Sequence, residues 1–105
     1  MVIIETKIFT KRVGKLLTED EYAKLQIHLA NFPASGKIIP ESGGLRKIRW
    51  SEEGRGKRGG ARVIYYCFVS DDQLIMLFIY SKNEADDLTK EQIKILRKLV
   101  EEELK

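Results

Sequence analysis

The chain has 105 residues, of which 43% are hydrophobic and 33% are charged, and its formal net charge is +3. These values are typical of one folded domain over residues 1–105, and they argue against a disordered chain. The start of the sequence lacks a signal-peptide pattern, and no stretch is apolar enough to span a bilayer, so we expect a cytoplasmic protein without a membrane partner.

The first half of the sequence predicts a strand followed by two helices. Val2–Glu5 is rich in β-branched residues, which favours a strand. Apolar residues then recur at helical spacing over residues 8–14, where Gly14 is expected to end a short helix. The capping box Thr18–Glu21 begins a second helix. This helix is expected to end before Pro33, because the residue preceding a proline avoids helical geometry.

The second half predicts three strands and a final helix. A loop with a brief extended piece at Ile38-Ile39 precedes the strand Leu45–Trp50. The apolar runs Ala61–Val69 and Leu74–Tyr80 predict an antiparallel hairpin, and a capping box at Thr89 begins the last helix. The predicted fold class is α+β, with N-terminal helices, a C-terminal helix and an antiparallel sheet of about four strands that is mixed at its edge.

Basic residues concentrate in the stretch Gly43–Arg62. This stretch has a net charge of +5, so the rest of the chain is net acidic. Strand alternation puts Lys47 and Arg49 on one face, whereas Arg46 falls on the apolar face. Arginines and lysines interspersed with glycines suit a polyanion such as RNA or DNA, and a solvated charged hairpin is the alternative.

The predicted hairpin brings three polar residues to one end of the sheet. Arg62 begins its first strand, and Tyr80 and Lys82 end its second strand, so antiparallel pairing places them together beside the basic loop. RNA cleavage needs a base for the 2′-hydroxyl, an acid for the leaving 5′-oxygen and positive charge on the transition state. Nearby arginines would lower the pKa of Lys82, which would then act as the base. The alternative is that these residues only bind phosphates, or that Tyr80 packs the sheet.

Other chemically versatile residues have simpler interpretations. No metal-ligand cluster is apparent, so we expect neither a metal nor another cofactor. His28 lies in a helix far from the basic stretch, and Cys67 lies in an apolar run that predicts a buried, unreactive thiol. Trp50 is expected in the core, with stacking on a base at the sheet edge as the alternative.

Three sequence blocks carry a family resemblance: Gly43–Trp50, Gly56–Tyr66 and Ile79–Leu88. Together they resemble the HigB-type branch of the RelE/ParE toxin superfamily, and the resemblance covers nearly the whole chain. It implies a RelE-like toxin of a type II toxin–antitoxin system. Such toxins are endoribonucleases (mRNA interferases) that cut mRNA in the ribosomal A site and inhibit translation.

The resemblance also implies partners and site residues. The partners are the ribosome, mRNA and a cognate antitoxin of the helix-turn-helix, HigA type, with operator DNA bound only through the toxin–antitoxin complex. By position, Arg62, Tyr80 and Lys82 match the catalytic residues. The residues matched to RNA binding are Arg46, Lys47, Arg49, Lys57 and Arg58.

One departure from the superfamily pattern affects the chemistry. Some of these toxins use histidines and an aspartate as acid and base, and His28 does not match those positions. The metal-free attack of the 2′-hydroxyl would therefore rest on lysine, arginine and tyrosine. Other superfamily members poison DNA gyrase, so a non-catalytic inhibitor of translation or gyrase is an alternative function, as is a plain nucleic-acid-binding module.

Overall fold

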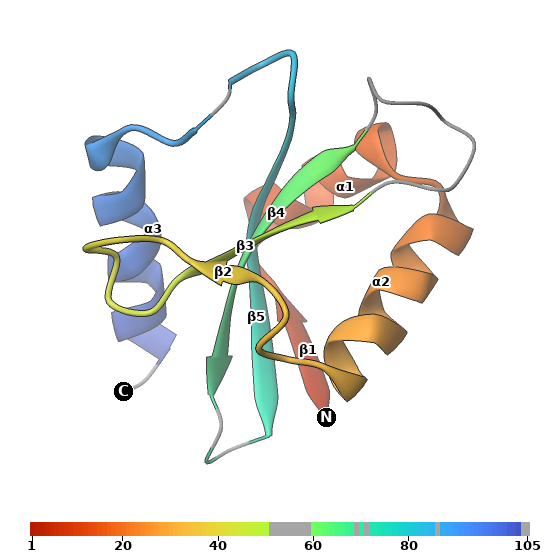
Figure 1. Cartoon of the computed structure of the whole chain (residues 1–105), viewed down its shortest axis with the longest axis horizontal. Helices are drawn as coiled ribbons and strands as arrows, with labels where there is room; N and C mark the ends of the chain where they lie inside the picture. The colour runs from red at the N-terminus through yellow and green to blue at the C-terminus, as the bar shows by residue number, and fades with distance from the viewer. Residues whose placement is uncertain (51–59, 69, 71, 86, 104–105) are drawn as a thin grey trace.

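The computed structural model describes residues 1–50, 60–68, 70, 72–85 and 87–103 (Figure 1). The elements in chain order are β1 (Val2–Glu5), α1 (Lys7–Leu16), α2 (Glu19–Asn31), β2 (Lys37–Ile38), β3 (Arg46–Trp50), β4 (Ala61–Phe68), β5 (Gln73–Ser81) and α3 (Lys90–Glu103). None of the helices in these ranges is long and apolar enough to cross a membrane.

The strands form one mixed sheet in the order β1-β5-β4-β3-β2. β1 runs parallel to β5, while the β5–β4, β4–β3 and β3–β2 pairs are antiparallel. The predicted α+β class and the mixed edge are confirmed. The sheet has five strands instead of about four, because Lys37–Ile38 pairs with β3 where only a brief extended piece was expected.

Helices cover both faces of the sheet, with α1 and α2 on one side and α3 on the other (Figure 1). Phe9, Leu25 and Leu29 belong to the core on the α1–α2 side. Leu96 and Val100 of α3 belong to the core on the other side. The central strands β4 and β5 are therefore buried on both faces, which explains their continuous apolar runs.

Side-chain caps fix the starts of α2 and α3. The Thr18 hydroxyl accepts a hydrogen bond from the Glu21 backbone N–H, and the Glu21 carboxylate accepts one from the Thr18 N–H. Thr89 and Gln92 form the same reciprocal pair before α3. Both predicted capping boxes are confirmed, and each satisfies donors that a helix start leaves unpaired.

The prediction that Gly14 ends the first helix is wrong, because α1 continues to Leu16. Thr6 caps this helix by accepting a hydrogen bond from the Phe9 N–H, and Phe9 is completely buried. Among the described residues, nothing apart from the neighbouring residues and the backbone of the helix itself lies within 4 Å of the position that a Gly14 Cβ would occupy. An exposed glycine costs a helix only about 1 kcal/mol relative to alanine, which capping and packing at the other end of α1 offset.

Helix α1 also completes the edge of β5. Strand β1 pairs with β5 only from Gln73 to Met76. Beyond that point, the Thr6 hydroxyl donates to the Leu77 carbonyl and the Arg12 Nε donates to the Ile79 carbonyl, each at 2.8 Å. These bonds satisfy buried acceptors that the short β1 cannot reach, and they fix α1 beside the end of β5.

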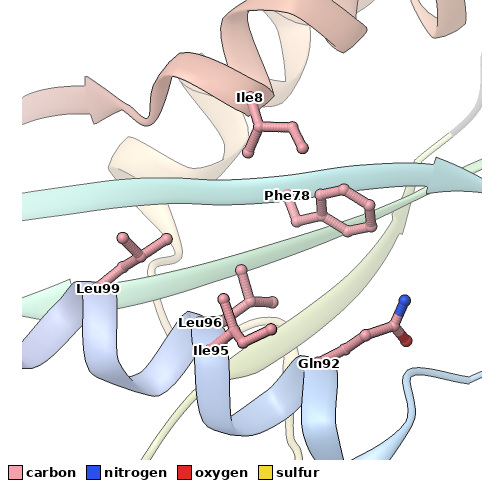
Figure 2. Close-up of a pocket in the computed structure, with 6 residues that line it drawn as sticks. All are labelled: Ile8, Phe78, Gln92, Ile95, Leu96 and Leu99. Atoms are coloured by element: carbon pink, nitrogen blue, oxygen red, sulfur yellow. The ribbon is translucent and has the colours of Figure 1, made fainter.

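An apolar groove of about 280 Å³ lies between α1 and α3 (Figure 2). It is lined by Ile8, Phe78, Gln92, Ile95, Leu96 and Leu99. The Arg12 guanidinium lies 5.0 Å from the Phe78 ring centroid, within the range of a cation–π contact. Ile8 and Ile95 are 46% and 61% exposed, so α3 leaves part of its apolar face uncovered.

The loop before β2 is held by two side chains of the sheet. The buried Tyr65 hydroxyl donates to the Pro33 carbonyl at 2.7 Å and accepts from the Gly36 N–H at 2.9 Å. The Arg46 guanidinium donates to the carbonyls of Gly36 and Ala34, at 2.8 and 3.2 Å. A side chain at residue 36 would clash with the Tyr65 ring, since its Cβ would lie 2.8 Å away.

We predict that Tyr65→Phe lowers the free energy of unfolding by about 1–3 kcal/mol, because it leaves the Gly36 N–H and the Pro33 carbonyl without their partner. Urea denaturation measures this change. The control is Tyr66→Phe, which removes a hydroxyl from a half-buried ring of the same strand. An equal loss in both variants would contradict the role given to Tyr65.

Candidate nucleic-acid interface

Strand β4 places Arg62 between two residues of the neighbouring strands. In the observed register Arg62 lies opposite Arg49 of β3 on one side and opposite Tyr80 of β5 on the other. Residues directly opposite each other in an antiparallel pair point to the same face of the sheet. Arg49, Arg62 and Tyr80 therefore form one row across the sheet, on the face that α3 covers.

Lys47 extends this row along β3, because it lies two residues before Arg49 and so shares its face. We call Lys47, Arg49 and Arg62 the cationic face. Lys47 Nζ donates to Asp87 Oδ1 at 2.6 Å. The pKa of the Asp87 carboxyl is held below its usual range, first by the hydrogen bond and charge of Lys47 and further by the charges of Arg49 and Arg62.

The members of the row differ in exposure. Arg62 is only 6% exposed and donates from Nη1 to the Gly60 carbonyl at 3.3 Å, whereas Arg49 is exposed. Tyr80 is 2% exposed and packs in the α3 core, with its ring stacked at 5.9 Å from the Phe78 ring. A guanidinium shielded from water attracts an anion more strongly than a solvated one does, so Arg62 is the strongest candidate for a phosphate contact.

Lys82 is exposed and lies in the turn that follows β5. The residue before it, Ser81, pairs with Ala61, which confirms the prediction that the start of β4 and the end of β5 meet at one end of the sheet. Glu84 fixes this turn, because its carboxylate accepts from the Ser81 N–H at 2.9 Å and pairs with Arg12 of α1. Helix α1 therefore supports the segment that carries Lys82.

Of the predicted RNA-binding residues that the structure describes, Arg46 does not join the cationic face. Arg46 lies opposite Tyr65 and points to the other face, where its guanidinium holds the loop before β2. Lys57 and Arg58 lie outside the described residues. Arg46 is better explained as a structural residue, because its Nη1 already donates to two backbone carbonyls of the loop.

Three other residues considered in the sequence, Trp50, His28 and Cys67, lie on the α1–α2 side. Trp50 packs against that core and donates to the Glu21 carbonyl at 2.9 Å, as the core interpretation predicted. The centroid of the His28 ring lies 5.2 Å from that of the Trp50 ring, with the two planes tilted by 41°, and Nε2 of His28 contacts the Ser35 hydroxyl. His28 is therefore across the sheet from Arg62. Cys67 is half-buried, and burial raises the pKa of its thiol, which makes it a weak nucleophile.

Sequence reasoning missed Asp87, Glu84 and Arg12. Asp87 contacts Lys47, and Arg12 contacts Glu84, so each of these pairs joins residues at least 40 positions apart in the chain. Glu84 also binds the Ser81 N–H within a turn that the strand pattern does not specify. Within the described part of the chain, no three side chains of His, Cys, Asp or Glu gather in a way that would hold a metal ion.

The mixed sheet with helices on both faces makes this an α+β protein. Cations gather at the end of its central hairpin, and such a row of positive charge is suited to binding a polyanion. The family described as "RelE toxin of RelE / RelB toxin-antitoxin system" matches residues 1–105. The chain therefore belongs to the RelE toxin family: it is the toxin of a toxin–antitoxin system, and its partner is an antitoxin.

A solved structure agrees with this assignment at the level of the fold. The chain is similar to the Escherichia coli toxin RelE, determined as a double arginine-to-alanine mutant in the free state, with a TM-score of 0.57 and 11% sequence identity. The similarity covers 81% of this chain and 86% of the other.

The turn carrying Lys82 makes a pH prediction. The Ser81 N–H first, and then Arg12, hold the pKa of Glu84 below its ordinary value of 4.5. A lowered folded-state pKa stabilises the protein above pH 4.5, and this stabilisation is lost as the pH falls through the folded-state value. We predict that Arg12→Gln raises the pKa of Glu84 only part of the way towards 4.5, because the Ser81 N–H remains.

A carbon-detected NMR titration of the Glu84 carboxyl measures this pKa. The matched control is Arg97→Gln, which removes the partner of Glu101 on α3 and should leave Glu84 unchanged. No shift in Arg12→Gln would show that Arg12 does not hold the turn.

Proposed function

We propose that this toxin is a ribosome-dependent mRNA endonuclease of the HigB-type branch, which cuts mRNA in the ribosomal A site and so inhibits translation. The observation that carries the proposal is the register that sets Arg62 between Arg49 and Tyr80, with Lys82 following at the same end of the sheet. The three sequence blocks that resemble the HigB-type branch support it, since they contain these residues.

The reaction requires no group beyond the chain, the RNA and the ribosome. The 2′-oxygen forms a bond to phosphorus while the bond from phosphorus to the 5′-oxygen breaks, which leaves a 2′,3′-cyclic phosphate and a 5′-hydroxyl. In the proposed roles, Lys82 accepts the 2′-hydroxyl proton and Arg62 stabilises the charge on the phosphate. The departing 5′-oxygen takes up a proton from water or from Tyr80, which either assists proton transfer in this way or stacks on a base.

We assign binding of the RNA backbone to the other basic residues of the stretch that contains Arg62. Lys47 and Arg49 present their charges beside Arg62, and we assign the same role to Lys57 and Arg58 of the basic loop. The function places the protein in the cytoplasm with ribosomes. Its antitoxin is proposed to be of the helix-turn-helix, HigA type, with operator DNA bound only through the complex.

One observation favours a second function. Arg62 and Tyr80 are 6% and 2% exposed, so only a small part of either residue is accessible to RNA in the free protein. A non-catalytic inhibitor of translation, or of gyrase, would need only the exposed part of the cationic face. A plain nucleic-acid-binding module would also need only that exposed part, but it would not arrest growth.

Expression in bacterial cells separates these functions. An endonuclease arrests growth and produces new mRNA ends in primer extension, a non-catalytic inhibitor arrests growth without new ends, and a binding module does neither. Ends carrying a 2′,3′-cyclic phosphate, and loss of cleavage when the 2′-hydroxyl at the cut site is replaced by hydrogen, would identify attack by the 2′-oxygen.

We predict that Arg62→Ala and Lys82→Ala relieve growth arrest and slow cleavage of ribosome-bound mRNA by about 10²–10³-fold, the usual cost of losing a group that stabilises the transition state. The matched control is Lys98→Ala, which removes an exposed lysine from α3. Because Arg62 is buried, its replacement could also unfold the protein. A thermal melt of Arg62→Ala, and the charge-conserving variant Arg62→Lys, test for this loss of folding. Full toxicity of both alanine variants would show that the site is misassigned.

A further inference from the structure

Asp87 occupies the position at the cationic face where a bound phosphate is expected. Its Oδ1 accepts the 2.6 Å hydrogen bond from Lys47 Nζ, and Arg49 and Arg62 lie on the same face of the sheet. A carboxylate and a phosphodiester both present two anionic oxygens to such donors. The side chain thus makes the contact with Lys47 that an RNA phosphate would make.

This contact is easily displaced. The Asp87 side chain is 77% exposed and that of Lys47 is 26% exposed, so water and salt reach the pair from outside. Exposed ion pairs contribute little to stability and weaken as the ionic strength rises. Asp87 lies between the turn after β5 and the Thr89 cap of α3, outside both elements.

We propose that Asp87 is a built-in competitor of the RNA phosphate. In the free protein its carboxylate neutralises part of the cationic face, and a substrate phosphodiester must displace it from Lys47. The choice of RNA as the ligand rests on the proposed function. The competition itself depends only on the geometry of Lys47, Arg49, Arg62 and Asp87. Its consequence is a toxin that binds RNA more weakly than its cations alone would allow.

A second explanation gives Asp87 the opposite effect on binding. If its hydrogen bond orients Lys47 towards the RNA, removing the carboxylate would weaken binding. The two explanations therefore differ in the sign of one measured change.

The test uses Asp87→Asn, which keeps the shape of the side chain and removes its charge. The matched control is Asp20→Asn, which removes the same charge from the exposed Lys24–Asp20 pair on α2. The probe is a fluorescein-labelled 2′-O-methyl RNA decamer, which lacks the 2′-hydroxyl and so cannot be cleaved. Fluorescence anisotropy from 50 to 200 mM KCl gives affinity and its salt dependence, and a thermal melt confirms that both variants are folded.

We expect Asp87→Asn to bind the decamer about three- to tenfold more tightly than the wild type, and Asp20→Asn to differ from it less than twofold. With about one more phosphate neutralised, the slope of log K against log salt should steepen by about 0.7. In a Lys47→Ala background the gain from Asp87→Asn should largely disappear, since the two residues are coupled.

Weaker binding by Asp87→Asn would overturn the proposal in favour of the orienting role. Equal gains in Asp87→Asn and Asp20→Asn would overturn the proposal, because they would show a general effect of net charge. An absence of RNA binding by every form would also overturn it. If Asp87→Asn binds more tightly but cells expressing the wild type show no new mRNA ends, only the endonuclease assignment fails. If the ends appear without the gain in affinity, only the competition fails.

Discussion

The pairing of β4 with both of its neighbours determines where the charged side chains of the sheet point. Its antiparallel register with β3 and β5 aligns Arg49, Arg62 and Tyr80, and the period of two along each strand sends Lys47 to the same face and Arg46 to the other. A slip of one residue would reverse every one of these positions. The two cores on either face of β4 hold this register, because a slip would move the apolar side chains of β4 out of the core that each one fills.

Parts of the chain far from this row keep it in place. The N-cap residue Thr6 and Arg12 of α1 both donate to carbonyls at the open edge of β5. Arg12 also pairs with Glu84 in the turn that carries Lys82. The loop before α3 supplies Asp87, whose charge opposes the cations beside it. The face is therefore built by the sheet, supported by α1 and partly neutralised by the loop that leads into α3.

Much of this arrangement could be predicted from the sequence, because it follows from local patterns. The capping boxes at Thr18 and Thr89 depend on residues three apart, and the hairpin depends on two apolar runs joined by a polar turn. The misses needed tertiary information. Gly14 remains helical because Thr6 and Phe9 anchor the helix, and the partner of Asp87 is 40 residues away in sequence. Strand alternation already put Arg46 on the apolar face of β3, and this position was the sequence signal for its structural role.

The central claim is that RNA binds where β3, β4 and β5 meet at Arg49, Arg62 and Tyr80. The most direct measurement is an NMR titration of the 15N-labelled protein with an uncleavable RNA, followed through its backbone amides. The account predicts that the largest shifts fall on the ends of these three strands and on the turn that carries Lys82. Largest shifts in α2 and in the loop held by Tyr65 and Arg46, on the other side of the sheet, would contradict it.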